Sequence, residues 1–225
     1  MLKKYDKLPE FLKNKKVKRY YDMLNKKRFY LFIKRLFDIV VSFILLIILS
    51  PVFLVVSILI KLDSKGPVFY RQKRITKYGK EFLIFKFRTM IPDADKGSLI
   101  TKNNDDRITK MGKKIRGSRL DEIPQLINVL KGEMSFVGTR PEVKEYVDEY
   151  TDEMKATLLM PAGITSRASI KFRDESKIMD KYSKKMSVSD IYIKKILPQK
   201  MVYNLEYLKN CSMIEDIRLC IKTVL

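Results

Sequence analysis

The sequence IVVSFILLIILSPVFLVVSILI, residues Ile39–Ile60, is the most apolar stretch of this 225-residue chain. Ile, Leu, Val and Phe make up 18 of its 22 residues, so a helix here would have almost no polar face. That helix would be about 33 Å long, against a hydrocarbon core of about 30 Å. We therefore predict a membrane segment. A fully buried core helix is the alternative, and a cleaved signal peptide is disfavoured because the apolar run starts late and is long.

Ser50 and Pro51 interrupt this stretch at its centre. Proline lacks a backbone N–H and disfavours a helical conformation in the residue before it. Lys and Arg flank the stretch on both sides, whereas a simple span normally carries more of them on one side. A kinked span tolerates such a break, but a segment that enters, breaks and returns to the same face explains both features. We favour a re-entrant helix over residues 36–61.

The chain is strongly basic, with 47 Lys and Arg, 26 Asp and Glu, and a formal net charge of +21. Residues 1–35 hold 13 of the basic residues and three acidic ones, directly ahead of the apolar stretch. Charge of this sign suits nucleic acid, anionic lipid or phosphate-bearing substrates. Its placement favours anionic membrane lipid as a partner and no nucleic acid. A membrane-tethered nucleic-acid-binding protein and a non-catalytic membrane scaffold are the alternative hypotheses.

Histidine and tryptophan are absent, and the two cysteines, Cys211 and Cys220, lie near the C-terminus. Without histidine, Ser-His-Asp catalysis, Cys-His catalysis and His-ligated zinc are excluded. Two cysteines cannot form a disulfide framework or a four-cysteine zinc site, which favours a reducing compartment. Acid–base or nucleophilic chemistry must therefore rest on carboxylates, Lys, Tyr, Ser, Thr or one of these cysteines.

The rest of the sequence predicts an α+β fold that is predominantly helical. Loosely alternating β-branched and aromatic residues around a polar turn predict a small β-hairpin between Val68 and Met90, and the polar run 91–110 predicts a long loop. Apolar spacing predicts a helix at Leu120–Leu130 with Gly132 as its stop, and another at Pro141–Thr157 that Pro161 ends. The last 30 residues suggest one or two amphipathic helices, at Tyr203–Asn210 and Ile214–Val224.

These patterns divide the chain into four parts. They are a basic juxtamembrane segment (1–35), the re-entrant helix (36–61), a cytoplasmic domain (62–190) and amphipathic interfacial helices (191–225).

The segment RGSRLDEIPQ, Arg116–Gln125, concentrates the reactive side chains. If Asp121 is the N-cap of the helix that follows, the electropositive helix end and Arg116 would bind phosphate and keep the Asp121 carboxylate ionised. Asp121 and its neighbour Glu122 could then hold Mg²⁺ or attack phosphorus. Acidic residues at helix starts are usually caps, so the pair alone leaves that simpler interpretation open.

Further short segments occur in a fixed order along the chain. They are KRLFD (Lys34–Asp38), GPVFYRQKR (Gly66–Arg74), KFRTM (Lys86–Met90), LDEIPQ (Leu120–Gln125), NVLKGEMSFVGTRPE (Asn128–Glu142) and PAGITS (Pro161–Ser166). Together they closely resemble the monotopic polyprenyl-phosphate phosphoglycosyl transferases, the bacterial sugar transferase family that starts glycan assembly. The resemblance covers about Lys34 to Glu175.

This resemblance implies a re-entrant membrane helix broken at Ser50 and Pro51, and an enzyme on the cytoplasmic face of the bacterial inner membrane. It also implies that Asp121 attacks the β-phosphate of a nucleotide-diphosphate sugar, with a UDP-sugar expected. A phosphosugar–aspartyl intermediate forms and the nucleoside monophosphate leaves. Polyprenyl (undecaprenyl) phosphate then accepts the sugar 1-phosphate, which starts a capsule, exopolysaccharide, O-antigen or glycoprotein glycan.

The resemblance also assigns supporting residues within 62–190, the catalytic domain. Glu122 would support Mg²⁺ binding or proton transfer, and the choice between Asp121 and Glu122 as metal ligand stays open. The residues expected around the substrate phosphates are Arg74, Lys86, Arg88, Arg116, Arg140 and Glu142. A homodimer is compatible with these expectations.

Two positions depart from many members of that family. This chain has Thr139 where they carry Pro, and Ser166-Arg167 where they carry Gly-Trp. Both lie near the expected sugar or nucleotide contacts, so the resemblance implies the reaction class but not the sugar.

Overall fold

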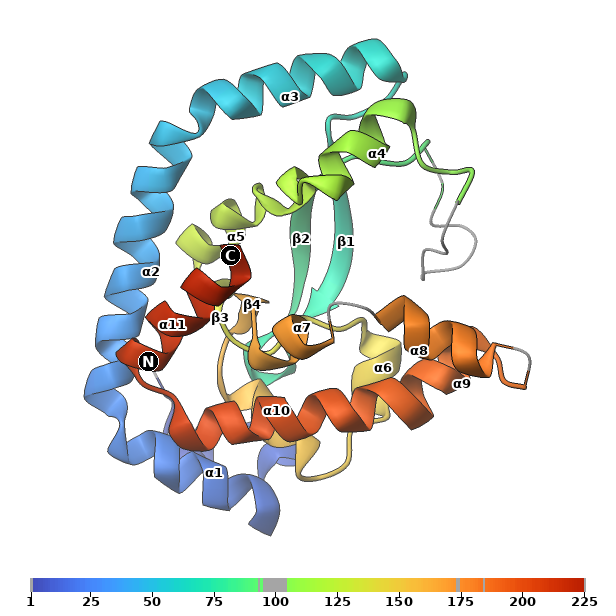
Figure 1. Ribbon diagram of the computed structural model, residues 1–225. Helices are drawn as coiled ribbons and strands as arrows, with labels where there is room; N and C mark the ends of the chain where they lie inside the picture. The colour runs from blue at the N-terminus through green and yellow to red at the C-terminus, as the bar shows by residue number, and fades with distance from the viewer. Residues whose placement is uncertain (1, 93, 95–104, 173–174, 184, 225) are drawn as a thin grey trace.

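The computed structural model describes residues 2–92, 94, 105–172, 175–183 and 185–224 (Figure 1). Its helices are α1 (Lys15–Lys26), α2 (Arg28–Ile48), α3 (Ser50–Asp63), α4 (Lys110–Gly117), α5 (Gln125–Lys131), α6 (Lys144–Asp148), α7 (Arg167–Lys171), α8 (Glu175–Tyr182), α9 (Val188–Ile191), α10 (Leu197–Asn210) and α11 (Met213–Val224). Its strands are β1 (Phe69–Ile75), β2 (Glu81–Phe87), β3 (Met134–Val137) and β4 (Ala162–Thr165). The expected mainly helical α+β class is confirmed.

The strands form two small sheets in the described part of the chain. Strands β1 and β2 pair antiparallel, with Phe69 opposite Phe87, which confirms the predicted hairpin. Strands β3 and β4 pair in parallel. Asn128, a fully buried residue of α5, links that helix to β2: its side chain donates to Leu83 O at 2.8 Å and accepts from Phe85 N at 2.9 Å.

The basic N-terminal segment contributes to the largest hydrophobic core. Leu12, Val17 and Leu24 are fully buried there, in one cluster with Leu159 and Met201. Lysines on the opposite face of α1 stay exposed. The segment is therefore anchored by its apolar face and presents its charge outward.

The apolar stretch forms two helices, α2 and α3, that meet at an angle of 60°. The break lies at Leu49, and Pro51 sits in the first turn of α3, where its missing N–H leaves no hydrogen bond unmade. Ser50 Oγ donates to Ile47 O at 2.8 Å. The predicted break at Ser50-Pro51 is confirmed. Within the described residues, no single helix could cross a membrane, but this bent pair could by length and composition.

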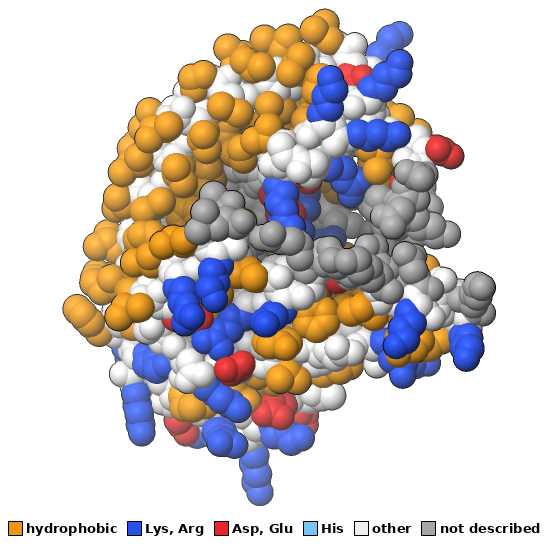
Figure 2. Space-filling model, in the orientation of Figure 1, with side chains coloured by type: hydrophobic (Ala, Val, Ile, Leu, Met, Phe, Trp, Pro, Cys, Tyr) orange, Lys and Arg blue, Asp and Glu red, His pale blue; other side chains and the backbone are white. Residues whose placement is uncertain are grey.

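Hydrophobic side chains cover the outer side of α2 and α3 (Figure 2). Phe29 is 77% exposed and Leu62 is 79% exposed, near the two ends of the pair, and apolar residues between them are also exposed. In water such a continuous apolar surface is unfavourable, so it marks a surface that contacts lipid or another apolar partner.

The inner side of α2 carries three charged residues that attach it to the rest of the molecule. Buried Lys34 pairs with Asp216 of α11 at 2.8 Å. Arg35 donates to Val129 O and Leu130 O, near the carboxyl end of α5, at 2.7 and 2.8 Å. Asp38 accepts from Ser135 Oγ at 3.1 Å, on β3. The helix is therefore apolar outward and fixed by polar contacts inward.

The predicted helix over Leu120–Leu130 is wrong in its first half. Arg119 has a left-handed backbone (φ 55°), the turn Leu120–Glu122 is 3₁₀, and α5 begins only at Gln125, with Pro124 as its N-cap. Without an N–H, Pro124 starts a helix more readily than it continues one. Asp121 is therefore not the cap of α5. The predicted stop at Gly132 is confirmed, with φ 83°.

The predicted helix over Pro141–Thr157 is confirmed only for Lys144–Asp148, which is α6, and its last part is wrong, because a 3₁₀ segment, Met154–Leu159, lies there. All four residues from Ala156 to Leu159 are buried, which one face of an amphipathic helix cannot accommodate. The two C-terminal helices are confirmed, although α10 starts six residues earlier than predicted. Of the predicted loop 91–110, residues 93 and 95–104 lie outside the described residues.

Candidate active site

Asp121 and Glu122 lie on the 3₁₀ turn that connects α4 to α5. Adjacent side chains on such a turn point about 120° apart. Asp121 lines a pocket of about 470 Å³, whereas Glu122 forms ion pairs with Lys86 and Arg140. The two neighbouring carboxylates therefore have different surroundings and can do different chemistry.

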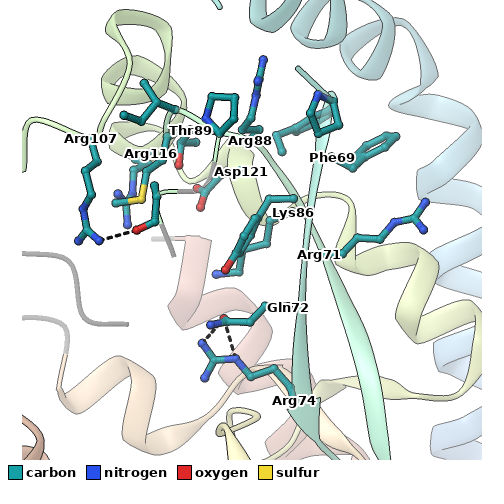
Figure 3. A pocket seen from close by; sticks show the side chains of 17 residues that line it. Phe69, Arg71, Gln72, Arg74, Lys86, Arg88, Thr89, Arg107, Arg116 and Asp121 are labelled. Atoms are coloured by element: carbon teal, nitrogen blue, oxygen red, sulfur yellow. Dashed lines mark hydrogen bonds between the residues drawn. The ribbon is translucent and has the colours of Figure 1, made fainter. Parts of the chain in front are cut away.

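The first pocket is strongly basic. Strands β1 and β2 supply one side of it and α4 supplies another (Figure 3). Among the described residues that line it, Asp121 is the one acid, and six are basic: Arg71, Arg74, Lys86, Arg88, Arg107 and Arg116. Such a concentration of positive charge around one carboxylate suits a ligand with several negative charges, such as a diphosphate.

Glu122 is held as a carboxylate by its partners. Arg140 Nη2 lies 2.5 Å from Glu122 Oε1, and Lys86 Nζ lies 2.9 Å from the same oxygen. Burial alone would raise the pKa of Glu122, but the charges and hydrogen bonds of Arg140 and Lys86 hold it well below its ordinary value. Glu122 therefore neutralises and positions two cations beside the first pocket.

The pKa of Asp121 is shifted in the opposite direction. Burial raises the pKa of its carboxyl group above the ordinary value, and the charge of Glu122 adds to this effect, while Lys86 and Arg116 oppose it. The helix N-terminus expected to hold Asp121 ionised is absent at this residue because α5 begins four residues later. A partly exposed carboxylate among basic groups is a suitable nucleophile or metal ligand.

The other predicted phosphate-binding residues divide between two pockets. Arg116 lines the first, and Arg74 and Lys86 line both. Arg140 and Glu142 instead line the second pocket, which has a volume of about 320 Å³. With Arg88, which also lines the first pocket, all six lie around the two pockets, and Arg74 and Lys86 line both.

Arg88 has a different environment from the others. It lines the first pocket, yet its guanidinium donates to Lys65 O and Ser64 O at 2.5 and 2.7 Å, just beyond the carboxyl end of α3. Only 5% of the residue is exposed. Its observed contacts tie the bent helix pair to the wall of the pocket.

Sequence reasoning did not single out several residues that the structure brings to the site. Gln125, Tyr192 and Lys200 line the second pocket, although Tyr192 and Lys200 come from the far C-terminal part of the chain. Gln125 belongs to the LDEIPQ segment, which was the one local signal for it. For Tyr192 and Lys200 the sequence contains no local signal, because only the packing of α10 and of the π-helical turn before it, Tyr192–Ile196, places them there.

Thr139, Ser166 and Arg167, the positions that depart from the family pattern, are not among the described residues that line the first or the second pocket. Arg167 pairs with Glu206 and Glu215 at 2.9 and 2.8 Å, and so ties α7 to α10 and α11. Thr139 is next to Arg140 and lines a third, small cavity.

The described residues contain no group of three or more Asp, Glu or Cys side chains that could hold a metal ion by themselves. A magnesium ion commonly uses one or two carboxylates together with substrate phosphates and water. Asp121 is the carboxylate that lines the basic pocket, while Glu122 Oε1 is already shared by two cations. The described residues thus offer Mg²⁺ one carboxylate, that of Asp121, and this fits the ion only if phosphate oxygens of a substrate supply further ligands.

Comparison with known proteins identifies a family and several related sequences. Residues 29–225 match the family described as bacterial sugar transferase. The UDP-N-acetylgalactosamine-undecaprenyl-phosphate N-acetylgalactosaminephosphotransferase of Aeromonas hydrophila is 44% identical over 126 residues, which are 56% of this chain and 30% of that protein. The UDP-glucose:undecaprenyl-phosphate glucose-1-phosphate transferase of Klebsiella pneumoniae is 39% identical over 166 residues, which are 72% of this chain and 36% of that protein.

These matches therefore span about a third of each of the two relatives. The family match covers most of this chain, including the Asp121–Glu122 turn and both pockets. The chain belongs to the bacterial sugar transferase family.

Proposed function

We propose that this protein is a phosphoglycosyl transferase that moves a sugar 1-phosphate from a UDP-sugar to undecaprenyl phosphate and so starts polysaccharide synthesis. The observation that carries this proposal is the position of Asp121 as the one described acid in a pocket lined by six basic side chains. The names of the relatives from Aeromonas and Klebsiella, which specify UDP-sugars and undecaprenyl phosphate, support the choice of substrates.

In the first step, a carboxylate oxygen of Asp121 attacks the β-phosphorus of the UDP-sugar. The bond from that phosphorus to the bridging oxygen breaks, and UMP leaves with the bonding electron pair. The sugar phosphate is then esterified to Asp121 as an acyl phosphate. Lys86 and Arg116, which lie beside Asp121, stabilise negative charge on the transferring group and on UMP.

In the second step, an oxygen of undecaprenyl phosphate attacks the same phosphorus and the Asp121 carboxylate is regenerated. The products are undecaprenyl-diphosphate sugar and free enzyme. Glu122 acts through its ion pairs with Lys86 and Arg140, holding both cations in place through both steps. It is a positioning residue in this scheme.

Magnesium is part of the proposal. Asp121 would hold it together with the donor phosphates, because Glu122 is engaged by Lys86 and Arg140. When bound, Mg²⁺ supplies Lewis-acid stabilisation of the phosphate charge.

The proposed location is the cytoplasmic face of the bacterial inner membrane, with α2 and α3 forming a re-entrant pair. The 60° bend, the exposed apolar side of both helices and the polar attachment of α2 through Lys34, Arg35 and Asp38 support this topology. Helix α11 adds exposed Ile214, 81% exposed, to the apolar surface, as expected for an interfacial helix. The proposal places anionic lipid against the basic N-terminal segment.

The full-length protein in lipid nanodiscs, with Mg²⁺ and a panel of UDP-sugars, tests this function. With undecaprenyl phosphate present, we expect continuous UMP release and an undecaprenyl-diphosphate sugar product. Without the acceptor, we expect about one equivalent of UMP and protein labelled by the radioactive sugar phosphate. If no UDP-sugar gave UMP in either condition, the proposal would be wrong.

A further inference from the structure

The second pocket lies directly beside the reactive turn. It shares Arg74 and Lys86 with the first pocket, and Lys86 is bonded to Glu122, the neighbour of Asp121. Its volume is about 320 Å³. A group bound in the second pocket would therefore be separated from a phosphate at Asp121 only by the shared side chains of Lys86 and Arg74.

Four described basic side chains line the second pocket, and each is paired with an acid: Arg74 with Glu142, Lys86 and Arg140 with Glu122, and Lys200 with Glu175. Tyr192 OH donates to Glu142 Oε1 at 2.5 Å, and Lys200 Nζ donates to Tyr192 OH at 3.2 Å. Each acid here thus has a basic or hydroxyl partner, and Tyr192 and Lys200 are 6% and 5% exposed. A neutral ligand rich in hydrogen-bonding groups suits this lining better than a phosphate does.

Gln125 supplies an independent sign that a ligand binds here. It is 1% exposed and lines the second pocket. Within the described residues, its amide nitrogen Nε2 has no hydrogen-bond partner. A buried donor without an acceptor is destabilising, and such groups in folded proteins are rare. An oxygen atom of a bound molecule would satisfy it.

We propose that the second pocket binds the sugar ring of the donor, and that Gln125 donates a hydrogen bond to an oxygen of that sugar. This inference rests on the proposed function. The sugar is joined through one oxygen to the phosphorus that Asp121 attacks, whereas the uridine is one phosphate further away. The sugar therefore lies closer to Asp121 and to Lys86, which lines the second pocket. The basic first pocket then holds the diphosphate and nucleotide. Gln125 and the Glu142–Tyr192–Lys200 network determine which sugar is accepted.

The substitution Gln125→Leu tests this assignment, with Gln199→Leu as the matched control. Gln199 is an exposed glutamine of α10, and its side chain donates to Lys195 O. For the UDP-sugar that the wild type uses best, we expect Gln125→Leu to lower kcat/KM about tenfold and to reduce discrimination among UDP-sugars. Inhibition by UDP, which lacks the sugar, should be unchanged. Gln199→Leu should match the wild type in all three measurements.

The outcomes separate the alternatives. An unchanged kcat/KM and unchanged sugar preference in Gln125→Leu would overturn the assignment. An equal loss in UDP inhibition would also overturn it, because it would place the nucleotide in the second pocket. Tyr192→Phe is a second variant if Gln125→Leu unfolds, as judged from its melting temperature, and the same shift in sugar preference is expected of it. Absence of wild-type turnover with every UDP-sugar would instead refute the proposed function.

Discussion

Arg140 Nη2 lies 2.5 Å from Glu122 Oε1, and this contact separates the roles of two adjacent carboxylates. Lys86, on β2, binds the same oxygen at 2.9 Å. With Glu122 engaged by two cations, Asp121 is left as the carboxylate that lines the basic pocket. The different roles of Asp121 and Glu122 therefore follow from where Lys86 and Arg140 lie.

Asp121→Asn should abolish the covalent intermediate, because an amide cannot serve as the nucleophile. We expect UMP release to fall by roughly 10³-fold or more, as found when a nucleophile is removed. Radioactive sugar phosphate should no longer label the protein, while binding to nanodiscs should persist. Labelling of Asp121→Asn at the wild-type level would show that another residue is the nucleophile.

Glu122→Gln should lower stability at neutral pH by about 1–3 kcal/mol, because Lys86 and Arg140 lose their charged partner. The pKa of Glu122 is below its ordinary value of 4.5 in the folded state. Its ion pairs therefore contribute fully above about pH 4.5, and the contribution is lost as the pH falls through the lowered folded pKa.

Melting temperatures of the wild type and Glu122→Gln, measured from pH 7 downward, check this prediction. The difference between them should be largest at neutral pH and shrink below about pH 4.5. A difference that stayed constant down to the lowest pH at which the protein folds would mean that the charge of Glu122 is not what stabilises the site.

Arg35→Ala should loosen the junction between α2 and the active-site helix α5. Arg35 donates to two backbone carbonyls near the carboxyl end of α5, so its loss leaves Val129 O and Leu130 O without these bonds. We expect a loss of about 2 kcal/mol in stability and a lower kcat, measured by thermal unfolding and UMP release. Arg28→Ala is the matched control, since Arg28 is an exposed arginine of the same helix whose Nε donates to Asn25 Oδ1, on the neighbouring helix α1. Equal effects of both substitutions would contradict the prediction.

The re-entrant topology predicts that residues on either side of the helix pair lie on the same face of the membrane. Lys16 and Lys80 are exposed and flank the pair in sequence. Lys16→Cys and Lys80→Cys, each introduced after replacement of Cys211 and Cys220 by Ser, should both react with a membrane-impermeant maleimide only after the cells are opened. Labelling of one from outside intact spheroplasts and the other only from inside would establish a span instead.

The break in the apolar stretch could be predicted because it depends on local chemistry: Pro51 cannot donate a backbone hydrogen bond, whatever surrounds it. The hairpin was predictable for a similar reason, since alternation and turn residues lie within one short segment. The start of α5 was mispredicted because the left-handed turn at Arg119 and the packing of α5 on α2 and β2 override the local capping pattern.

The division of the predicted site residues between two pockets could not be predicted either. Arg140 was expected around phosphate, yet it pairs with Glu122 and lines the second pocket. Arg88 binds the backbone just beyond α3. Both outcomes depend on residues far apart in sequence that only the folded chain brings together.

The sequence by itself determined that this chain carries a broken apolar segment, a histidine-free set of reactive groups and the Asp121–Glu122 pair among basic residues. These are properties of residue type and short-range order. Only the tertiary structure decided which carboxylate faces the basic pocket and which is held by Lys86 and Arg140. The physical reason is that charges act through space: the partners of Glu122 lie 36 and 18 residues away along the chain, and no local pattern encodes such distances.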